Sequence, residues 1–278
     1  MNVSEVSSDL YLDKNGIYIV KDDATQCVSY PDDGNESCYQ LEDVSFWFGF
    51  RNKCILSIIN RFSPSGTLID IGGGNGYVTR AVLDSGFDAA LLEPGYSGAL
   101  NGKNSRNIKT VICATLENAR FKESSISAFG CFDVIEHIEN DVAFINELYK
   151  ALIPGGYLYI TVPAHNWLWS SSDITAKHFR RYNKASIESL FNSNYKIEYF
   201  TYFFGILIIP ILLFRTLPYL LFKKKRSSVF NGDVEHGASK GRLISLINRV
   251  LNFELSKINR GLGVLLGSSC LLVVKKVQ

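Results

Sequence analysis

The sequence has little net charge and no closely paired cysteines, and each shortage excludes a class of function. Its 29 Lys and Arg residues nearly balance 27 Asp and Glu residues, which leaves a formal net charge of +2. No nucleic-acid partner is expected, because binding to nucleic acid usually requires an excess of basic residues on one face. The six cysteines are scattered, without a CxxC pair. Since a zinc site needs four ligands at short paired spacings, no metal site is expected.

The N-terminus also lacks the apolar segment that a secretory signal requires. Residues 1–16 are polar and partly acidic, so no signal peptide is predicted. Unpaired cysteines are typical of a reducing compartment, and we expect a cytoplasmic protein. The chain does have 46% apolar residues, enough for a full hydrophobic core. Residues 1–44, rich in Asp, Asn, Ser and Gly, are predicted to be a leader packed on the main domain.

Short apolar runs alternate with segments that can be helical. A helix is expected over residues 46–62, followed by a turn at Ser63–Gly66. Strands are predicted over residues 67–71, 89–92, 108–113, 127–132, 157–162, 197–202 and 268–274. Helices are predicted between them over residues 76–84, from Asn140 or Asp141 to about 152, and over 185–191. This alternation predicts a doubly wound, mostly parallel α/β sheet.

The segment LIDIGGGNGYVTR, residues 68–80, joins the first of these strands to a helix. Glycines at this position let the backbone approach a nucleotide closely at the carboxyl end of the sheet. The dinucleotide pattern GxGxxG fails in both registers, because Tyr77 or Asn75 falls where a glycine is required. The pattern that fits is acid-x-GxGxG, formed by Asp70, Gly72, Gly74 and Gly76.

This pattern resembles the first motif of the class I S-adenosylmethionine (SAM) dependent methyltransferases. The resemblance implies SAM as the cofactor and a Rossmann-like, seven-stranded sheet. Glu93 ends the second strand about 20 residues after the glycines, where a carboxylate can accept hydrogen bonds from both ribose hydroxyls. The segments FDVIEHIEND and LIPGGYLYITVPA resemble the fourth and fifth strands of small-molecule methyltransferases. The same resemblance implies that Asp70 and Asp133 lie near the methionine part of SAM and Leu116 near the adenine.

A second segment, LWSSSDITAKHFRRY at residues 168–182, resembles a loop of one bacterial subgroup of these enzymes. That subgroup has a pattern close to WSxxDxxxGHxRRY, with glycine where this chain has Lys177. Because the loop follows the carboxyl end of a strand, we expect it to contact the methyl acceptor. The residues predicted to bind substrate are Trp169, Arg180, Arg181 and Tyr182, and the two arginines suit a phosphate or carboxylate. The alternative is a charged surface loop at the start of a helix.

Methyl transfer from a sulfonium needs few catalytic groups, because the methyl group is already activated. The protein mainly aligns the acceptor and removes its proton. His178 and His137 are the candidate bases, since imidazole titrates near neutral pH, and Asp173 is the third catalytic candidate. Each histidine has a structural alternative, in which its ring holds a loop in place. Trp47 and Arg51 are one helical turn apart, and two interpretations stay open: the pair covers the cofactor, or it is an ordinary core residue next to a surface residue.

Residues 203–262 depart from the alternation of strands and helices. They are predicted to be a hydrophobic helical insertion before the last strand, so that the SAM-binding domain consists of residues 45–202 and 263–278. The insertion begins with the apolar run FFGILIIPILLF, and a basic run, Lys223 to Arg226, follows. An amphipathic helix is expected near residues 243–258.

Three interpretations of this insertion stay open: an interfacial or re-entrant membrane anchor, a hydrophobic cap or dimer surface, and a membrane span. A span is disfavoured because Arg215 would lie near the middle of the bilayer and because Pro210 and Pro218 interrupt the helix. The basic run favours contact of residues 203–226 with an anionic lipid surface.

The leading hypothesis is a SAM-dependent enzyme that methylates an oxygen or nitrogen of a small molecule or a lipid-linked saccharide. With an anchor, it would act at the inner face of the cytoplasmic membrane. A second hypothesis is a catalytically silent scaffold of the same fold at the membrane. The glycine spacing disfavours a nicotinamide oxidoreductase. The segment DVIEH disfavours a nucleic-acid methyltransferase, because it differs from the Asn/Asp-Pro-Pro-Tyr/Phe pattern around a flipped base.

Overall fold

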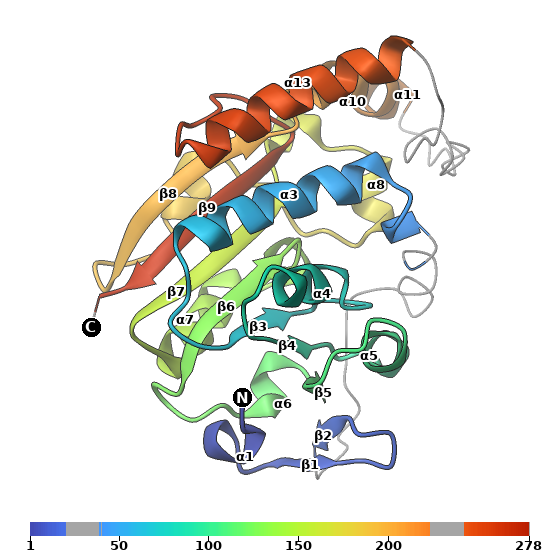
Figure 1. The fold of residues 1–278 in the computed structure, drawn as a ribbon. Coiled ribbons are helices and arrows are strands. Elements are labelled where there is room, and N and C mark those ends of the chain that lie inside the picture. Colours follow the sequence, from blue (N-terminus) through green and yellow to red (C-terminus); the bar gives the residue numbers. More distant parts are fainter. Residues whose placement is uncertain (21–38, 40, 223–241, 278) are drawn as a thin grey trace.

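The computed structural model describes residues 1–20, 39, 41–222 and 242–277 (Figure 1). Cys27, Cys38 and the basic run 223–226 lie outside these residues. Within this part of the chain, nine strands form one sheet in the order β1-β2-β5-β4-β3-β6-β7-β9-β8. The strands are β1 Leu10–Leu12, β2 Tyr18–Val20, β3 Leu68–Ile71, β4 Ala89–Leu92, β5 Val111–Cys113, β6 Ile126–Phe132, β7 Leu152–Pro163, β8 Tyr195–Phe203 and β9 Ser269–Lys276.

The predicted doubly wound sheet is confirmed, with a correction to its size. Strands β5, β4, β3, β6 and β7 are parallel, and β9 lies antiparallel between β7 and β8. The predicted count of seven strands was wrong, because the leader adds two more. Strand β2 pairs in parallel with β5, and β1 pairs antiparallel with β2. Backbone pairing of such short pieces at a sheet edge leaves only a weak pattern in the sequence.

Helices cover both faces of the sheet (Figure 1). One face packs on α3, α4 and α13 through residues such as Cys54, Val82 and Leu251, and the other on α1, α7 and α9 through residues such as Val6 and Ile145. The helices are α1 Val3–Val6, α3 Phe46–Arg61, α4 Tyr77–Asp84, α5 Tyr96–Asn104, α6 Leu116–Ala119, α7 Asp141–Ala151, α8 Ser171–Thr175, α9 Lys184–Glu188 and α13 Arg242–Asn259. Helix α5 had not been predicted from the sequence.

The central strand β3 shows why the site forms where it does. All four of its residues are buried, as in a parallel strand covered on both faces. Leu68 faces the cluster under α3, whereas Ile69 and Ile71 face the cluster under α7. The remaining residue, Asp70, is a carboxylate with 1% exposure at the carboxyl end of the strand. A buried charge at this place requires partners from the loops that follow.

After β8 the chain continues as short helical pieces: η3 Gly205–Leu207, α10 Ile208–Ile211, the π-helix η4 Leu212–Thr216 and α11 Leu217–Phe222. The Glu254 carboxylate of α13 accepts hydrogen bonds from the backbone amides of Phe204 (2.8 Å) and Gly205 (3.0 Å), which ties these pieces to α13. Helix α13 itself packs on α3. None of the helices in the described residues combines the length and the apolar character needed to cross a membrane.

Candidate active site

A cavity of about 1330 Å³ opens at the carboxyl ends of β3, β4 and β6. This is the switch point of the sheet, where ligands of doubly wound folds bind. The glycine turn and Glu93 line one side of the cavity. His137, His178 and Arg181 line the other side, together with residues of the 203–222 segment.

The glycine turn has the backbone shape that its sequence predicts. Gly72 and Gly74 line the cavity with φ of 60° and 56°, values that residues other than glycine rarely adopt. Gly76, with φ of 78°, stands at the start of α4 and is not among the cavity-lining residues. A Cβ atom at Gly76 would lie 2.3 Å from Cδ1 of Ile108. Two of the three predicted glycines therefore face the cavity, and the third lets α4 start close to the core.

Glu93 lies beside this turn with 6% exposure. Its Oε2 accepts a hydrogen bond from the Gly74 amide (2.9 Å) and its Oε1 one from the Gly95 amide (2.8 Å). These two bonds fix the carboxylate at the cavity wall, at the position where the sequence predicts a contact to the ribose hydroxyls. Leu116 also lines the cavity, next to Thr115 and Glu117. The two predicted contacts to ribose and adenine thus share one end of the cavity.

Asp70 is the buried acid of the motif, and it also lines the cavity. Its Oδ2 accepts a hydrogen bond from the Thr79 hydroxyl at 2.6 Å, whereas Oδ1 has no hydrogen-bond partner in the described part of the chain. Burial raises the pKa of Asp70 to about 7, although the Thr79 hydrogen bond and the Arg51 charge act in the opposite direction. A buried acid with a spare oxygen fits the positively charged methionine part of SAM.

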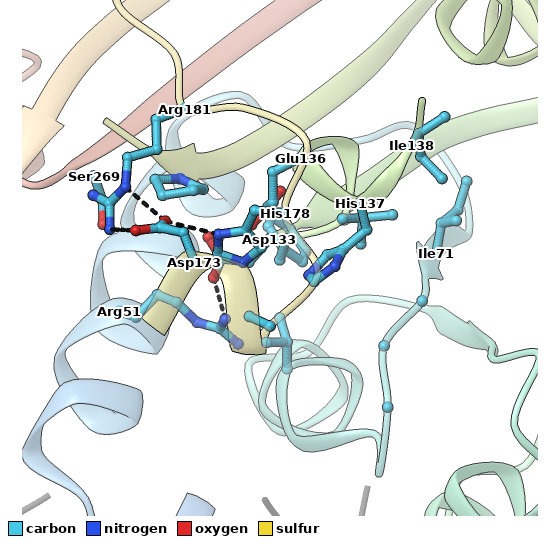
Figure 2. Close-up of a pocket in the computed structure, with 18 of the residues that line it drawn as sticks. Arg51, Ile71, Asp133, Glu136, His137, Ile138, Asp173, His178, Arg181 and Ser269 are labelled. Atoms are coloured by element: carbon cyan, nitrogen blue, oxygen red, sulfur yellow. Dashed lines mark hydrogen bonds and ion pairs between the residues drawn. The ribbon is translucent and has the colours of Figure 1, made fainter. Parts of the chain in front are cut away.

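Helix α3 closes the cavity with the predicted pair Trp47 and Arg51. The Arg51 guanidinium forms an ion pair with Asp133, the residue that follows β6 (Figure 2). The same guanidinium lies 5.0 Å from the centroid of the Trp47 ring, which stacks on Phe204. Arg51 therefore joins α3 to the end of β6, and both Trp47 and Arg51 line the cavity.

Asp173 is the centre of the 168–182 loop, named the acceptor loop after its predicted role, and has 1% exposure. Its Oδ1 lies 2.7 Å from Nε of Arg181 and 3.0 Å from Nδ1 of His178, and Oδ2 lies 3.1 Å from Nη2 of Arg181 (Figure 2). Burial alone would raise the pKa of Asp173, but the His178 hydrogen bond and the Arg181 charge outweigh it and lower the pKa. Asp173 thus stays ionised and orients its two neighbours.

The two candidate bases lie side by side in the cavity. The ring centroids of His137 and His178 are 4.8 Å apart and nearly perpendicular. Burial, helped by the His178 charge, lowers the pKa of His137 to about 4. Between β6 and these rings lies Glu136, a residue of the cavity lining that was not among the predicted site residues.

Three of the four predicted substrate residues are not among the cavity-lining residues. Arg180 forms an ion pair with Asp141 (2.5 Å), and its Nη2 donates a hydrogen bond to the Glu139 carbonyl (2.6 Å). Tyr182, with 2% exposure, donates its hydroxyl hydrogen to the same Asp141 (2.8 Å). Trp169, near the start of the loop, is half-buried. Only Arg181 lines the cavity, and its guanidinium is held by Asp173.

The 203–222 segment supplies a wall of the cavity that the sequence did not predict. One side of this segment lines the cavity with Leu207, Pro210, Ile211, Phe214 and Arg215. Thr216 anchors it, because its buried hydroxyl donates a hydrogen bond to the Leu168 carbonyl (3.0 Å). One feature of the sequence could have indicated this wall: Arg215 is the single charged residue in an otherwise apolar run. A charged side chain in such a run needs polar surroundings, such as a cavity.

The strand order, the glycine turn and the acid at the end of β4 together define a Rossmann-like methyltransferase fold. The family described as "Methyltransferase domain" matches residues 47–197, more than half of the chain. The chain belongs to this family. It is a SAM-dependent methyltransferase, and the residues of the glycine turn, Glu93 and Asp70 fit that cofactor.

Solved structures support the fold. The putative sarcosine dimethylglycine methyltransferase of Galdieria sulphuraria is 14% identical, with a TM-score of 0.55 over 89% of this chain and 98% of that one. Haemonchus contortus phosphoethanolamine N-methyltransferase 2, in complex with phosphomonomethylethanolamine and S-adenosylhomocysteine, is 20% identical, with a TM-score of 0.54 over 92% of this chain and 60% of that one. A putative methyltransferase in complex with the Haloferax volcanii Trm112 activator is 15% identical, with a TM-score of 0.56 over 88% and 95%. No curated protein sequence matches the chain.

Proposed function

We propose that the enzyme transfers the methyl group of SAM to an oxygen or nitrogen of a small molecule or a lipid-linked saccharide. The observation that carries this proposal is the continuous cavity, which runs from the glycine turn to the inner side of the 203–222 segment. Its volume of about 1330 Å³ exceeds the range of about 300–1,000 Å³ that is typical of small-ligand pockets. The cavity therefore has room for a cofactor and an acceptor together.

The residues divide this space between the two substrates. Glu93, Asp70 and the glycine turn bind and orient SAM, which supplies an activated methyl group for in-line displacement. The acceptor lies beside His137 and His178, where its proton can be removed as the methyl group is transferred. Asp173 acts as a positioning residue, because both of its oxygens are occupied by the loop that it orients.

An anionic group on the acceptor would suit the far wall of the cavity. Arg215, in the π-helix of the 203–222 segment, lines the cavity there. Guanidinium groups bind phosphate with two parallel hydrogen bonds, and the linker of a lipid-linked saccharide is a phosphate or pyrophosphate. The apolar residues around Arg215 would contact the lipid next to that linker.

The outer side of the same segment supports a membrane location. Its exposed residues include Ile209, Leu220 and Leu221, each at least 60% exposed. In the sequence the basic run 223–226 follows directly, and each basic residue near an anionic surface contributes about 1 kcal/mol. The proposal is a cytoplasmic enzyme that docks this side on the inner face of the cytoplasmic membrane, so that a lipid-linked acceptor enters from the bilayer.

Methyl tracing with labelled SAM tests the proposal. Purified protein is incubated with a membrane extract, and lipid, protein and water-soluble fractions are separated. Label in the lipid or lipid-linked saccharide fraction is expected, and it should disappear in the Glu93→Ala variant, which lacks the ribose contact. Label in water-soluble small molecules alone would contradict the lipid-linked acceptor. Absence of label from every fraction, with SAM binding intact, would favour a silent scaffold.

A further inference from the structure

Three potential metal ligands meet on the acceptor side of the cavity. Glu136 and His137 belong to the short 3-10 helix η1 (Ile135–His137) that follows β6, and His178 belongs to the acceptor loop. One donor atom from each lies within 4.8 Å of the others. All three side chains line the cavity, and Figure 2 shows them around one point. Small movements of these side chains would bring the donors to the distances of a shared ion.

Both imidazole rings are held in the way that metal-binding histidines usually are. Such histidines bind the ion through one nitrogen and form a hydrogen bond to a carboxylate or backbone group through the other. His178 uses Nδ1 for its contact with Asp173 (3.0 Å), which leaves Nε2 for a ligand. His137 forms a hydrogen bond with the backbone of Ala176. The acceptor loop thus orients both rings.

Glu136 gives the second, independent indication. It has 1% exposure, and its Oε2 has no hydrogen-bond partner among the described residues. The two nearby carboxylates are neutralised, Asp133 by Arg51 and Asp173 by Arg181. No ion pair of Glu136 occurs in the part of the chain that the structure describes. A buried carboxylate without a cation is costly, and a bound divalent ion would remove that cost.

We propose that Glu136, His137 and His178 bind one divalent transition-metal ion. Two imidazoles and one carboxylate suit zinc, manganese, iron or cobalt better than magnesium, which prefers oxygen ligands. Three protein ligands leave coordination positions open toward the cavity. The absence of paired cysteines in the sequence does not argue against this site, because its ligands are histidine and glutamate from two distant segments.

The role of the ion rests on the proposed function. An ion beside the acceptor lowers the pKa of an acceptor hydroxyl, so that its proton leaves to water. The acceptor oxygen then forms a bond to the methyl carbon while the carbon–sulfur bond of SAM breaks, and S-adenosylhomocysteine leaves. Binding of the ion, in contrast, depends only on the three side chains, so the two proposals can fail separately.

Cobalt binding tests the site without measuring activity. The full-length protein is treated with a chelator and titrated with Co²⁺, whose visible absorption reports nitrogen and oxygen ligands. We expect one Co²⁺ per chain in the wild type. Loss of an outer hydrogen bond to a metal ligand usually weakens binding about 10–100-fold, and we expect Glu136→Gln and His178→Gln to weaken it at least that much. His165→Gln is the matched control, because His165 lies outside the cavity lining.

SAM binding, measured on the same samples, shows that each variant is folded. The site is supported if wild type and His165→Gln bind Co²⁺ equally and both Glu136→Gln and His178→Gln bind it more weakly. Absence of Co²⁺ binding in the wild type, or equal binding in all four proteins, would overturn it. Co²⁺ binding without SAM binding would overturn the proposed function and leave the metal site standing.

Discussion

The cofactor side and the acceptor side of the cavity are built in different ways. On the cofactor side, Asp70, Gly72, Gly74 and Glu93 come from the ends of two neighbouring strands, and backbone amides hold the Glu93 carboxylate. The acceptor side brings together η1, the 168–182 loop and the 203–222 segment, which are distant in the sequence. The comparison shows that backbone geometry shapes the cofactor side, whereas ion pairs between side chains shape the acceptor side.

The largest effect is expected from breaking the ion pair at the centre of the acceptor side. Replacing Asp173 with Ala leaves Arg181 buried without a counter-charge, which costs about 3–5 kcal/mol. The free energy of unfolding in urea should fall by this amount, while the folded fraction still binds SAM. The double variant Asp173→Leu/Arg181→Met is the control and should recover most of the loss. If the folded fraction of Asp173→Ala failed to bind SAM, the cofactor side and the acceptor side of the cavity would not be independent.

The sequence could indicate which residues meet on the cofactor side, because the determinants of that side are local: Asp70, Gly72, Gly74 and Glu93 all line the cavity. The GxGxG spacing and the acid at the end of the next strand follow from one strand–turn–helix unit, so reading consecutive residues was sufficient. Helix α5, in the same region, was missed because the segment YSGALNGKN has two glycines and two asparagines, which are poor helix formers. Its Gly102 packs so closely that a Cβ atom would lie 2.4 Å from Cδ2 of Leu91. Tertiary packing there outweighs helix propensity.

The acceptor side was predicted only in part. The sequence indicated the loop and both histidines, but it could not tell which charged residues would pair within the protein. Arg180 and Tyr182 both contact Asp141, a pairing between two distant segments. Glu136 and Arg215 were missed for the same reason, since only the folded chain shows which side chains face the cavity.

A smaller loss of stability is expected from adding a methyl group on the cofactor side. Gly76→Ala puts a non-glycine residue at φ of 78° and a Cβ atom 2.3 Å from Cδ1 of Ile108. The strain costs about 1–2 kcal/mol, and the displaced Ile108 side chain adds about 1 kcal/mol. Gly86→Ala is the matched control, because Gly86 has φ of 87° but nothing within 4 Å of the added Cβ. Equal urea midpoints for the two variants would contradict the close packing of the turn.

A pH dependence should distinguish the cofactor side from the acceptor side. Burial raises the pKa of Asp70 from 3.8 to about 7, so folding is favoured by the protonated form. The contribution of the protonated Asp70 to the free energy of unfolding is present in full below about pH 4, and it is lost as the pH rises through about 7. Because the positive charge of SAM favours the ionised carboxylate, SAM affinity should rise about tenfold per pH unit below 7 and then level off.

Calorimetric titrations of SAM at several pH values measure this dependence. In Asp70→Asn the slope should vanish, because the amide does not titrate. Asp173→Asn should keep the slope, since that residue belongs to the acceptor side. A slope that persists without Asp70 would assign the titration to another group.

The smallest effect on stability is expected from substitutions at the outer side of the 203–222 segment. The same substitutions should nevertheless abolish binding of the protein to membranes. Leu220 and Leu221 are 60% and 73% exposed, so replacing both with Glu should change the free energy of unfolding by less than about 0.5 kcal/mol each. If this surface docks on lipid, the two new negative charges should abolish sedimentation with anionic vesicles, because apolar contact is lost and the charges are repelled. Val142→Glu, at a 50% exposed position of α7, should sediment as the wild type does. Equal sedimentation of all three proteins would mean that the acceptor reaches the cavity from solution. The acceptor side and the cofactor side would then be built in different ways, but both would open to water.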